Sequence, residues 1–386
     1  MSGSPLRVGM VTSVGNRCGI AAYTAALMAE MAPLADVRLE AIQPGKQPLP
    51  HYEAMAQRLN GCDLIHVQHE YSFWGSVMPG ANAFGALRAM LHKPVVVTGH
   101  TTYTAAEMLR VAEETRAPHR IAKQALLLWP PYRAQVERVP FAGGHVIVHT
   151  DEGRDALAAR GLPQRLLHVL PAGIPAGPPA RTGGAAFRGR FGLGSKRLVV
   201  IFGFVNPYKG NEVALQAARD WPADVALVLA GGARTPEEQP YVDQLQASLT
   251  TGGMAGRALI TGYLSDEDVA EAMAAADLVL IPHTQATGSY SVTVPIFYGR
   301  PMVASDLACF SEIARDGHCI LVFPAGDAAR LSEAVTGLLG DASERDRMAA
   351  AALAYGRARS WRAVAEGTLG IYRQALDDAA GLRHGV

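Results

Sequence analysis

A lysine in the turn between a buried strand and a helix is the residue whose position most clearly predicts chemistry. The stretch 199–210 reads VVIFGFVNPYKG, in which a β-branched apolar run is followed by the chain-breaking residues Gly203 and Pro207. Lys209 then stands just before a helical pattern over 212–219. Such a turn directs backbone amides and a helix dipole at one point, where the lysine adds a full charge. The pattern predicts an anion site, with a solvated loop lysine as the alternative.

Two further polar groups follow apolar strands in the first half. His69 and Glu70 come directly after the strand expected at 62–68, and His100 comes after the strand expected at 94–98. Ligands bind at the carboxyl ends of parallel strands. The aromatic side chains next to the His-Glu pair are Tyr71, Phe73 and Trp74. Aromatic faces beside a charged pair suit a sugar-like ligand, and a surface pair over a small aromatic core is the alternative.

A glycine-containing loop also follows the first expected strand, 6–12. It contains Gly15 and Gly19 and leads into a helical pattern. Glycine lets a backbone approach a ligand closely, but the dinucleotide-binding pattern GxGxxG is absent. The loop is compatible with a ligand loop and with a plain turn.

Apolar runs alternate with helical patterns through both halves of the chain, which predicts an α/β fold. The expected strands are 6–12, 62–68, 94–98 and 145–149 in the first half and 198–201, 225–230, 258–261, 278–281 and 301–304 in the second. A segment rich in proline and glycine separates the halves. We therefore predict two Rossmann-like domains facing a cleft. Their bounds are 1–177 and 196–360, with a linker at 178–195 and a terminal helix within 361–386 that completes the first domain.

Composition restricts the class of protein. The 386 residues are 49% hydrophobic and 18% charged, with 35 basic and 35 acidic side chains. This balance argues against a protein that binds nucleic acid through bulk charge. The four cysteines are scattered without metal-ligand spacing, which favours a reducing compartment. We see neither a signal peptide nor a run long enough to span a bilayer, so we expect a cytoplasmic protein.

One basic segment, 116–138, leaves a membrane role open. Arginines and lysines flank the apolar run Leu126–Trp129. The pattern is typical of a solvated helix with an ordinary core face. It is also compatible with peripheral contact at the inner, anionic face of a membrane.

An ordered set of motifs resembles the GT-B glycosyltransferases, in the large, mostly retaining family 4-like group that contains many bacterial glucosyl- and mannosyltransferases. In the second half the motifs are GFVNPYKG, LVLAGG, ITGYLSDEDVAEAMAAADLVLIP and GRPMVASD. In the first half they are GNRCGIAAYTAAL, HVQHEYSFWG and VVVTGHTTY. SWRAVAEGTLGIYRQAL resembles the terminal helix that crosses back onto the first domain. The resemblance covers nearly the whole chain.

The resemblance implies a hexosyltransferase that moves a sugar from a nucleoside-diphosphate sugar to an acceptor hydroxyl. It implies retention at the anomeric carbon, no metal ion, and no cofactor other than the nucleotide-sugar co-substrate. The acceptor would be a sugar, a lipid-linked molecule or a small molecule. The sequence defines neither the base and sugar of the donor nor the oligomeric state.

Carried over residue by residue, the resemblance places Lys209 at the leaving diphosphate and His100 beside the transferred sugar. These two are the predicted catalytic residues. The predicted donor-binding residues are Gly19, Gly203, Asn206, Lys209, Thr287, Gly288, Ser289, Tyr290, Ser291 and Glu312. The predicted acceptor-binding residues are Arg17, Tyr23, His69 and Glu70.

The chain departs from the family pattern at three positions. Phe204 stands where an arginine usually follows the glycine of the phosphate loop. Ala286 and Val294 stand where two glutamates eight residues apart are usual. The segment 287–291 instead offers several hydroxyl groups for hydrogen bonds to a sugar or a diphosphate, and a turn that is merely polar is the alternative. The departures keep two other functions open, a GT-B protein that binds a nucleotide sugar or partner without catalysis, and a sugar-nucleotide epimerase.

Overall fold

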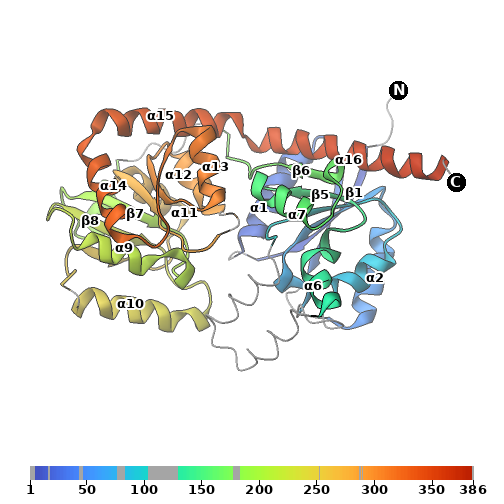
Figure 1. The fold of residues 1–386 in the computed structure, drawn as a ribbon, viewed down its shortest axis with the longest axis horizontal. Helices are drawn as coiled ribbons and strands as arrows, with labels where there is room; N and C mark the ends of the chain where they lie inside the picture. Colours follow the sequence, from blue (N-terminus) through green and yellow to red (C-terminus); the bar gives the residue numbers. More distant parts are fainter. Residues whose placement is uncertain are drawn as a thin grey trace. The chain divides into compact units, whose positions relative to one another are not determined.

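The chain forms two compact units, each with its own parallel sheet (Figure 1). The computed structural model describes residues 5–15, 18–42, 47–75, 83–102, 129–176, 183–251, 253–286, 288 and 290–384. The first unit contains Met1–Gly173 and Trp361–Val386, and the second contains Ile174–Ser360. The predicted α/β class is confirmed.

The first unit contains a six-stranded parallel sheet in the order β2-β1-β3-β4-β5-β6. Its strands are β1 Arg7–Ser13, β2 Asp36–Ile42, β3 Leu64–His69, β4 Val95–Gly99, β5 His145–Val148 and β6 Leu167–Val169. The chain reverses direction across the sheet between β1 and β3. In doubly wound sheets, ligands bind outside the carboxyl ends of the strands at this reversal.

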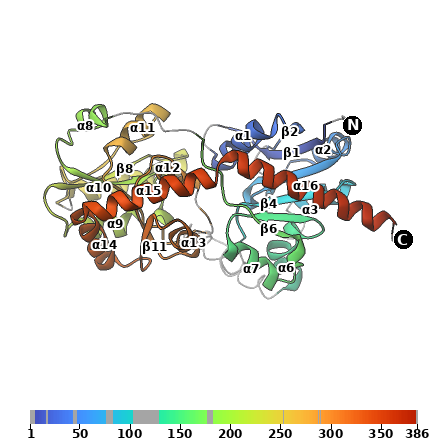
Figure 2. The same cartoon turned by 90° about the horizontal axis from the view of Figure 1, so that it is seen from above.

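The two faces of this first sheet differ in polarity because successive side chains of a strand point to opposite faces. Val95 and Val97 point into an apolar core with α2 (Leu49–Leu59), α3 (Phe84–Met90) and α7 (Asp151–Ala159). Thr98 points to the other face, beside Tyr372 and the rest of α16. Helices α1 (Gly19–Met31) and α16 (Trp361–His384) pack against each other there (Figures 1 and 2). The terminal helix thus belongs to the first unit, as the sequence predicted.

The second unit contains a six-stranded parallel sheet in the order β12-β11-β10-β7-β8-β9. Its strands are β7 Arg197–Phe202, β8 Val225–Ala230, β9 Ala258–Ile260, β10 Leu278–Ile281, β11 Met302–Ser305 and β12 Ile320–Phe323. Strand order reverses between β7 and β10, so the loops after these two strands flank the reversal point.

Strand β7 shows why its sequence reads as a continuous apolar run. Leu198 and Val200 point into one core, with α8 (Ala185–Arg190), α11 (Asp266–Ala275), α12 (Thr293–Phe297), α13 (Ala308–Gly317) and α15 (Ala342–Ala358). Val199 and Ile201 point into the other, with α9 (Asn211–Ala218), α10 (Gln239–Thr251) and α14 (Ala328–Gly340). A parallel strand covered by helices on both faces needs apolar side chains at every position.

The domain bounds observed differ in detail from those predicted. The units divide after Gly173 and after Ser360, so the start of the second unit lies before the predicted linker at 178–195. Part of that segment is helix α8, whose Phe187 is buried in the core of the second unit. The structure also contains three strands that the sequence did not predict, β2, β6 and β12. Most of the basic segment at 116–138 lies outside the described residues, which resume at Trp129.

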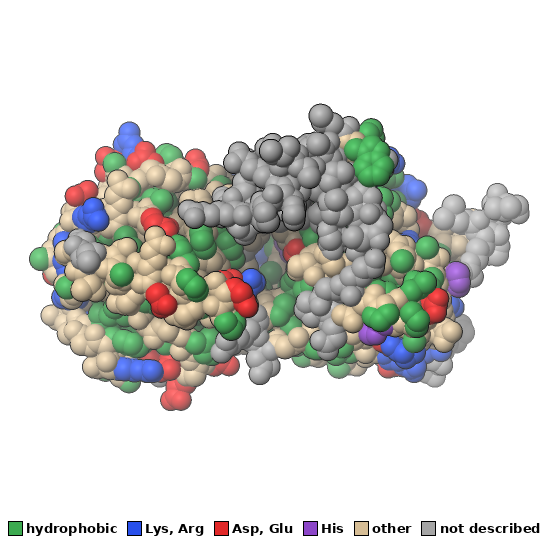
Figure 3. Space-filling model, turned by 90° about the horizontal axis from the view of Figure 1, so that it is seen from below, with side chains coloured by type: hydrophobic (Ala, Val, Ile, Leu, Met, Phe, Trp, Pro, Cys, Tyr) green, Lys and Arg blue, Asp and Glu red, His purple; other side chains and the backbone are tan. Residues whose placement is uncertain are grey.

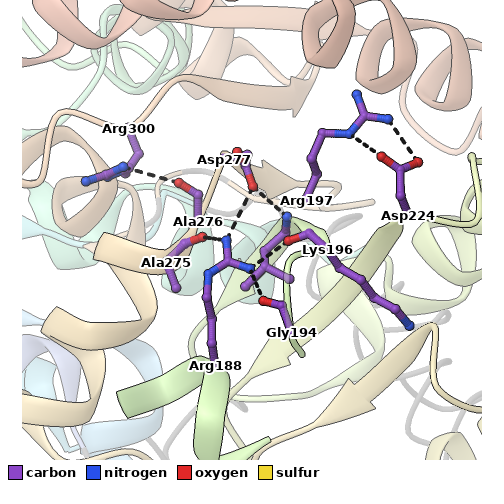
Figure 4. A network of polar contacts seen from close by, with 10 residues as sticks. Arg188, Gly194, Lys196, Arg197, Asp224, Ala275, Ala276, Asp277 and Arg300 are labelled. Atoms are coloured by element: carbon purple, nitrogen blue, oxygen red, sulfur yellow. Dashed lines mark hydrogen bonds and ion pairs between the residues drawn. The ribbon is translucent and has the colours of Figure 1, made fainter. Parts of the chain in front are cut away.

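An arginine of α8 closes the end of the second sheet where β7 and β10 begin (Figure 4). The Arg188 guanidinium donates to the backbone oxygens of Gly194, Lys196 and Ala275 and lies 3.7 Å from the Asp277 carboxylate. Asp277 in turn accepts the backbone N–H of Leu198 at 2.7 Å. The guanidinium thus satisfies carbonyls that would otherwise lack partners.

We expect Arg188→Met to lower the free energy of unfolding by about 2–3 kcal/mol, because several charge-assisted hydrogen bonds are lost and their acceptors are left unpaired. Arg190→Met on the same helix is the matched control. The Arg190 side chain is 55% exposed in its ion pair with Asp268. Exposed pairs contribute less than about 1 kcal/mol. Urea unfolding of the two variants measures the difference, and equal losses would contradict this account of Arg188.

Candidate functional site

Three loops of the second unit meet with their backbones in contact at the carboxyl ends of β7, β8 and β10. A Cβ on Gly231 would lie 1.9 Å from the oxygen of Gly203, and one on Gly210 would lie 1.8 Å from the oxygen of Pro282. Gly210 also has a φ of 68°, in the left-handed region, immediately before α9. Only glycine fits at these two positions, and the close approach brings the turn after β7 against the turn after β10.

Lys209 lies in this group of loops with its charge almost uncompensated. Its side chain is 6% exposed, and its Nζ donates to Ser291 Oγ at 3.1 Å. Among the described residues no carboxylate lies within ion-pair distance of it. Burial lowers the pKa of Lys209 to about 8. A buried ammonium group with one hydroxyl partner is expensive unless a ligand supplies negative charge, so the arrangement fits an anion.

His283 is a member of this site that the sequence analysis missed. It follows Pro282 at the end of β10, is 2% exposed, and neither ring nitrogen has a hydrogen-bond partner. Its ring lies between those of Tyr208 and Phe310, with centroid distances of 6.2 Å and 5.3 Å. Burial, and then the charge of Lys209, hold the pKa of His283 well below its usual range. The sequence did contain a signal for this residue, because His283 is polar and comes directly after the apolar strand β10 and Pro282.

The other predicted donor-binding residues of the second unit are placed as follows. Asn206 is buried, and its Oδ1 has no hydrogen-bond partner. Tyr290 and Ser291 begin the short helix η6 (Tyr290–Val292), and Gly288 is exposed before it. Gly203 precedes Asn206 in the loop after β7, where a Cβ on Gly203 would lie 3.4 Å from Lys209 Nζ. Lys209, Ser291 and Gly203 are thus brought together.

The remaining predicted donor-binding residues are Glu312 and two residues of the segment 287–291. Glu312 is half-buried on α13. Burial raises the pKa of Tyr355 on α15 to about 12, and the charge of Glu312 adds a smaller contribution. Thr287 and Ser289 lie outside the described residues.

The two positions without the usual glutamates belong to the hydrophobic core. Ala286 and Val294 are half-buried and pack against the cluster that contains Ile296 and Phe310. A carboxylate at either position would border apolar side chains. The local packing therefore agrees with the apolar residues found there.

In the first unit, His100 lies in a hydrogen-bonded group at the carboxyl edge of the sheet. Its Nε2 is 2.8 Å from Gln68 Oε1 and its Nδ1 is 3.2 Å from Nε2 of His149. The Tyr23 ring packs edge-on against His100 at 5.0 Å and also against Trp361 at 5.0 Å. Burial, and then the neighbouring His149, hold the pKa of His100 well below its usual range. His100 is therefore a neutral imidazole at pH 7.

His69 does not fit its predicted role as an acceptor ligand. It is fully buried on the other face of the sheet, and neither ring nitrogen has a hydrogen-bond partner. Aromatic rings surround it, namely Tyr71, Trp74, Phe84 and Phe141. Burial lowers the pKa of His69 to about 3. The alternation of side chains explains the difference, because residue 69 has the opposite parity to Gln68.

The other predicted residues of the first unit have structural partners. Glu70 caps η1 (Tyr71–Trp74) through the N–H of Tyr71 and accepts the hydroxyl of Thr101, so it joins the loops after β3 and β4. Tyr23 is 3% exposed and supports His100 through its ring. Gly19 is exposed as the first residue of α1, which leaves its backbone open to a ligand. Arg17 lies outside the described residues.

The described residues can also be compared with what a charged binding surface, a metal site or a membrane span would require. Acidic and basic side chains are interspersed on the face seen in Figure 3. Within the described ranges, no group of three or more His, Cys, Asp or Glu side chains is arranged to hold a metal ion. None of the described helices has the length and apolar composition that crossing a membrane requires.

Family comparisons match both units. Residues 37–177 match the family model described as Glycosyltransferase Family 4, and residues 196–341 match the model described as Glycosyl transferases group 1. A D-inositol 3-phosphate glycosyltransferase of Xylanimonas cellulosilytica is 28% identical over 292 residues, which cover 73% of this chain and 66% of that protein. An alpha-maltose-1-phosphate synthase of Mycobacterium tuberculosis is 29% identical over 316 residues, covering 72% and 79% respectively. The first two curated relatives are thus spanned over 66% and 63% of their length, just under two thirds.

Solved structures share the fold. Anabaena HepE in complex with UDP and glucose superposes with a TM-score of 0.73 at 17% identity, over 96% of this chain and all of that one. A sucrose-phosphate synthase of Thermosynechococcus elongatus gives 0.71 at 17% identity, over 97% of this chain and all of that one. The fold and its paired parallel sheets define a protein of the GT-B class. Together with the two family models, they show that this chain belongs to the GT-B glycosyltransferases of the family 4 type.

We expect His69 to make the first unit sensitive to acid. Its folded-state pKa of about 3 lies below that of an unfolded imidazole, so the unfolded chain binds the proton first as pH falls below about 6.5. The stability contributed by the neutral form is therefore lost as pH falls. Between pH 7 and pH 5 the loss is about 2 kcal/mol for this group.

Urea unfolding of the wild type and of His69→Phe at both pH values measures this effect, and the variant should lose about 2 kcal/mol less on acidification. Phe84→Leu disturbs the same aromatic cluster without removing a titratable group. It should keep the wild-type dependence on pH. Identical pH slopes in the wild type and His69→Phe would show that His69 does not titrate as described.

Proposed function

We propose that this protein is a hexosyltransferase that moves a sugar from a nucleoside-diphosphate sugar to an acceptor hydroxyl, with retention at the anomeric carbon. The family supports the reaction class, and the names of relatives such as the D-inositol 3-phosphate glycosyltransferase support a hydroxyl acceptor. Anabaena HepE, which shares the fold and was solved in complex with UDP and glucose, supports a nucleotide sugar as the donor. The proposed acceptor class is a sugar, a lipid-linked molecule or a small molecule.

The observation that carries the proposal is the buried Lys209 at the reversal point of the second sheet. Its ammonium group donates to Ser291 Oγ at 3.1 Å. The loop that carries it contacts the loops after β8 and β10 through glycine backbone atoms. A diphosphate gains negative charge as the glycosidic bond breaks. A preorganised cation in a desolvated site stabilises that charge in the transition state more than in the ground state.

His100 is assigned to the sugar side of the reaction. Its imidazole at the end of β4 can form hydrogen bonds with a sugar hydroxyl. Burial lowers the pKa of His100, so the ring stays neutral and carries no positive charge. The acceptor would bind to the first unit near the exposed start of α1, with Glu70 and Tyr23 holding the surrounding loops and ring in place. Arg17, two residues before α1 in the sequence, is the predicted acceptor contact with a positive charge.

The donor site is proposed to work without the usual arginine and glutamates. Phe204, Ala286 and Val294 supply neither charge nor hydrogen bonds from their side chains. Asn206 Oδ1 and both ring nitrogens of His283 are buried without hydrogen-bond partners in these loops, and the half-buried Ser291 hydroxyl accepts a hydrogen bond from Lys209. In the proposal, these groups meet the hydroxyl groups of a sugar. These groups take the place of the missing carboxylates in the proposal.

Neutralisation of the phosphate charge is assigned to Lys209 and the amino-terminal end of α9 rather than to a divalent cation. Transfer should therefore continue in the presence of EDTA. We propose a cytoplasmic location with access to the inner face of the membrane when the acceptor is lipid-linked.

A nucleotide-sugar panel separates this proposal from its two alternatives. The purified chain is incubated with UDP-, GDP- and ADP-linked hexoses, and products are followed by mass spectrometry. Release of nucleoside diphosphate with a glycosylated acceptor or free sugar supports transfer, whereas an isomerised donor identifies an epimerase. Binding by calorimetry without any turnover identifies a protein that has lost catalysis, an outcome favoured by the absence of acidic side chains at 286 and 294.

We expect Lys209→Ala to lower turnover about tenfold to a hundredfold, because a charge-assisted contact to the leaving group contributes about 1.5–3 kcal/mol. Lys196→Ala is the matched control, since Lys196 precedes β7 at the opposite end of the strand. It should leave turnover within about twofold. Wild-type turnover in Lys209→Ala would remove Lys209 from the site.

The low pKa of Lys209 predicts how diphosphate binding depends on pH. The charged form binds the anion, so affinity should be constant below pH 8 and fall above it, by at most about tenfold per pH unit. Lys209→Arg keeps its charge throughout this range and should bind with an affinity independent of pH. Calorimetric titration with UDP and GDP between pH 7 and pH 9.5 checks both expectations. The same decline in both proteins would assign the titration to another group.

A further inference from the structure

His149 and His100 form a hydrogen-bonded pair whose proton positions can be worked out from their neighbours. His149 follows β5, and its Nδ1 lies 2.9 Å from the backbone oxygen of Leu170. Its Nε2 lies 3.2 Å from Nδ1 of His100. On the far side of His100, Nε2 lies 2.8 Å from the side-chain amide of Gln68, which is fully buried.

The backbone carbonyl of Leu170 fixes the first proton. A carbonyl oxygen only accepts, so Nδ1 of His149 must carry hydrogen. In a neutral His149, Nε2 is then an acceptor, and the hydrogen bond from His100 requires a proton on Nδ1 of His100. Neutral His100 therefore has its lone pair on Nε2.

Gln68 can satisfy that lone pair in one orientation of its amide. With Oε1 facing His100, two acceptors would meet at 2.8 Å unless the histidine pair bound one additional proton. Burial lowers the pKa of both His100 and His149, which disfavours that proton near neutral pH. With the amide turned over, its NH2 group donates to His100 Nε2. The positions of the amide oxygen and nitrogen are assigned from the hydrogen-bond network, which here favours the turned orientation.

The turned amide pairs correctly with His66 and loses one weak hydrogen bond, the one that Gln68 Nε2 would otherwise donate to Met10 Sδ at 3.4 Å. His66 Nε2 lies 3.4 Å from the Gln68 amide and 2.7 Å from Thr98 Oγ1, and its Nδ1 lies 2.6 Å from the hydroxyl of Tyr372. With the Gln68 oxygen on this side, His66 donates from Nε2 and accepts the Tyr372 proton at Nδ1. Each of these contacts between Leu170 and Tyr372 then joins a donor to an acceptor, without any added proton.

We propose that His149 is a positioning residue that fixes the tautomer of His100, with hydrogen on Nδ1 and the lone pair on Nε2. In this state His100 accepts a hydrogen bond at Nε2, from Gln68 or from a substrate hydroxyl, whereas the other tautomer and the imidazolium would donate one. The role of the tautomer in transfer rests on the proposed function, but its assignment does not. Among the described residues, the titratable groups that act on His100 are Tyr23 of α1, which packs against its ring, and His149, His66 and His69, whose charges would lower its pKa. His69 acts from the opposite face of the sheet.

Nitrogen-15 NMR of the histidine rings in the full-length chain tests the assignment without any substrate. Long-range proton–nitrogen correlations distinguish the two neutral tautomers, and His100→Gln identifies the His100 signals. We expect hydrogen on Nδ1 of His100 in the wild type and in His149→Gln, whose amide oxygen can still accept. His149→Phe removes the acceptor and should give a mixture of tautomers. Hydrogen on Nε2 in the wild type, or an unchanged tautomer in His149→Phe, would overturn the proposal.

Kinetics of the same variants test the consequence for transfer. We expect His149→Phe to lower kcat about tenfold to a hundredfold with little change in donor KM, as for partners that orient a reactive histidine. His149→Gln should recover part of the loss. His145→Phe is the matched control, because His145 starts the same strand and contacts His168 and Asp378 rather than His100.

The two proposals fail in different ways. Wild-type kcat in His149→Phe, despite a changed tautomer, would overturn the positioning role. Loss of kcat in His145→Phe equal to that in His149→Phe would assign the effect to general damage and also overturn it. Absence of transfer in the wild type, with the expected tautomers, would refute the proposed function and leave the assignment of His100 intact.

Discussion

Side chains of a parallel sheet alternate between its two faces, and this constraint decides which polar residues of the first unit can act together. His66, Gln68, Thr98, His100 and His149 all have the parity that points toward α1 and α16. His69 has the opposite parity and lies among aromatic rings. A shift of one residue in β3 would exchange these roles. The polar network and the apolar core therefore depend on the same register.

The two units solve the problem of buried polar groups in opposite ways. In the first unit, histidines remain neutral and share hydrogen bonds in a chain that ends at the Leu170 carbonyl on one side and at Tyr372 on the other. In the second unit, the loops after β7 and β10 bury a lysine with a hydroxyl partner and a histidine without hydrogen bonds. The hydrogen-bonded chain of the first unit is complete without a ligand, while His69, which lies outside it, leaves both ring nitrogens unpaired among aromatic rings. The second unit differs because it also buries a charge, that of Lys209, which is costly until an anion meets it.

Much of the fold could be predicted because buried parallel strands have a strong signature. The runs at 198–201 and 225–230 are apolar at every position and were predicted within one or two residues of β7 and β8. The missed strands are short or lie at sheet edges. β2 exposes part of its length and carries charged residues, and β6 is three residues long. The linker was misplaced because α8 is short and rich in glycine and arginine, although Phe187 is fixed in the core.

The candidate site was predictable where one residue at a strand end carries the chemistry, as for Lys209 and His100, whose roles stay predictions. It was not predictable where a role depends on partners from distant segments. The Leu170 carbonyl fixes the proton of His149 on Nδ1. The contact between His149 and His100 then fixes the proton of His100, although these residues are far apart in the sequence. His69 failed for the converse reason, since its neighbour in sequence is the polar Glu70 while its parity places it among aromatic rings. Chemistry at the edge of such a sheet is therefore best inferred from parity first and residue type second.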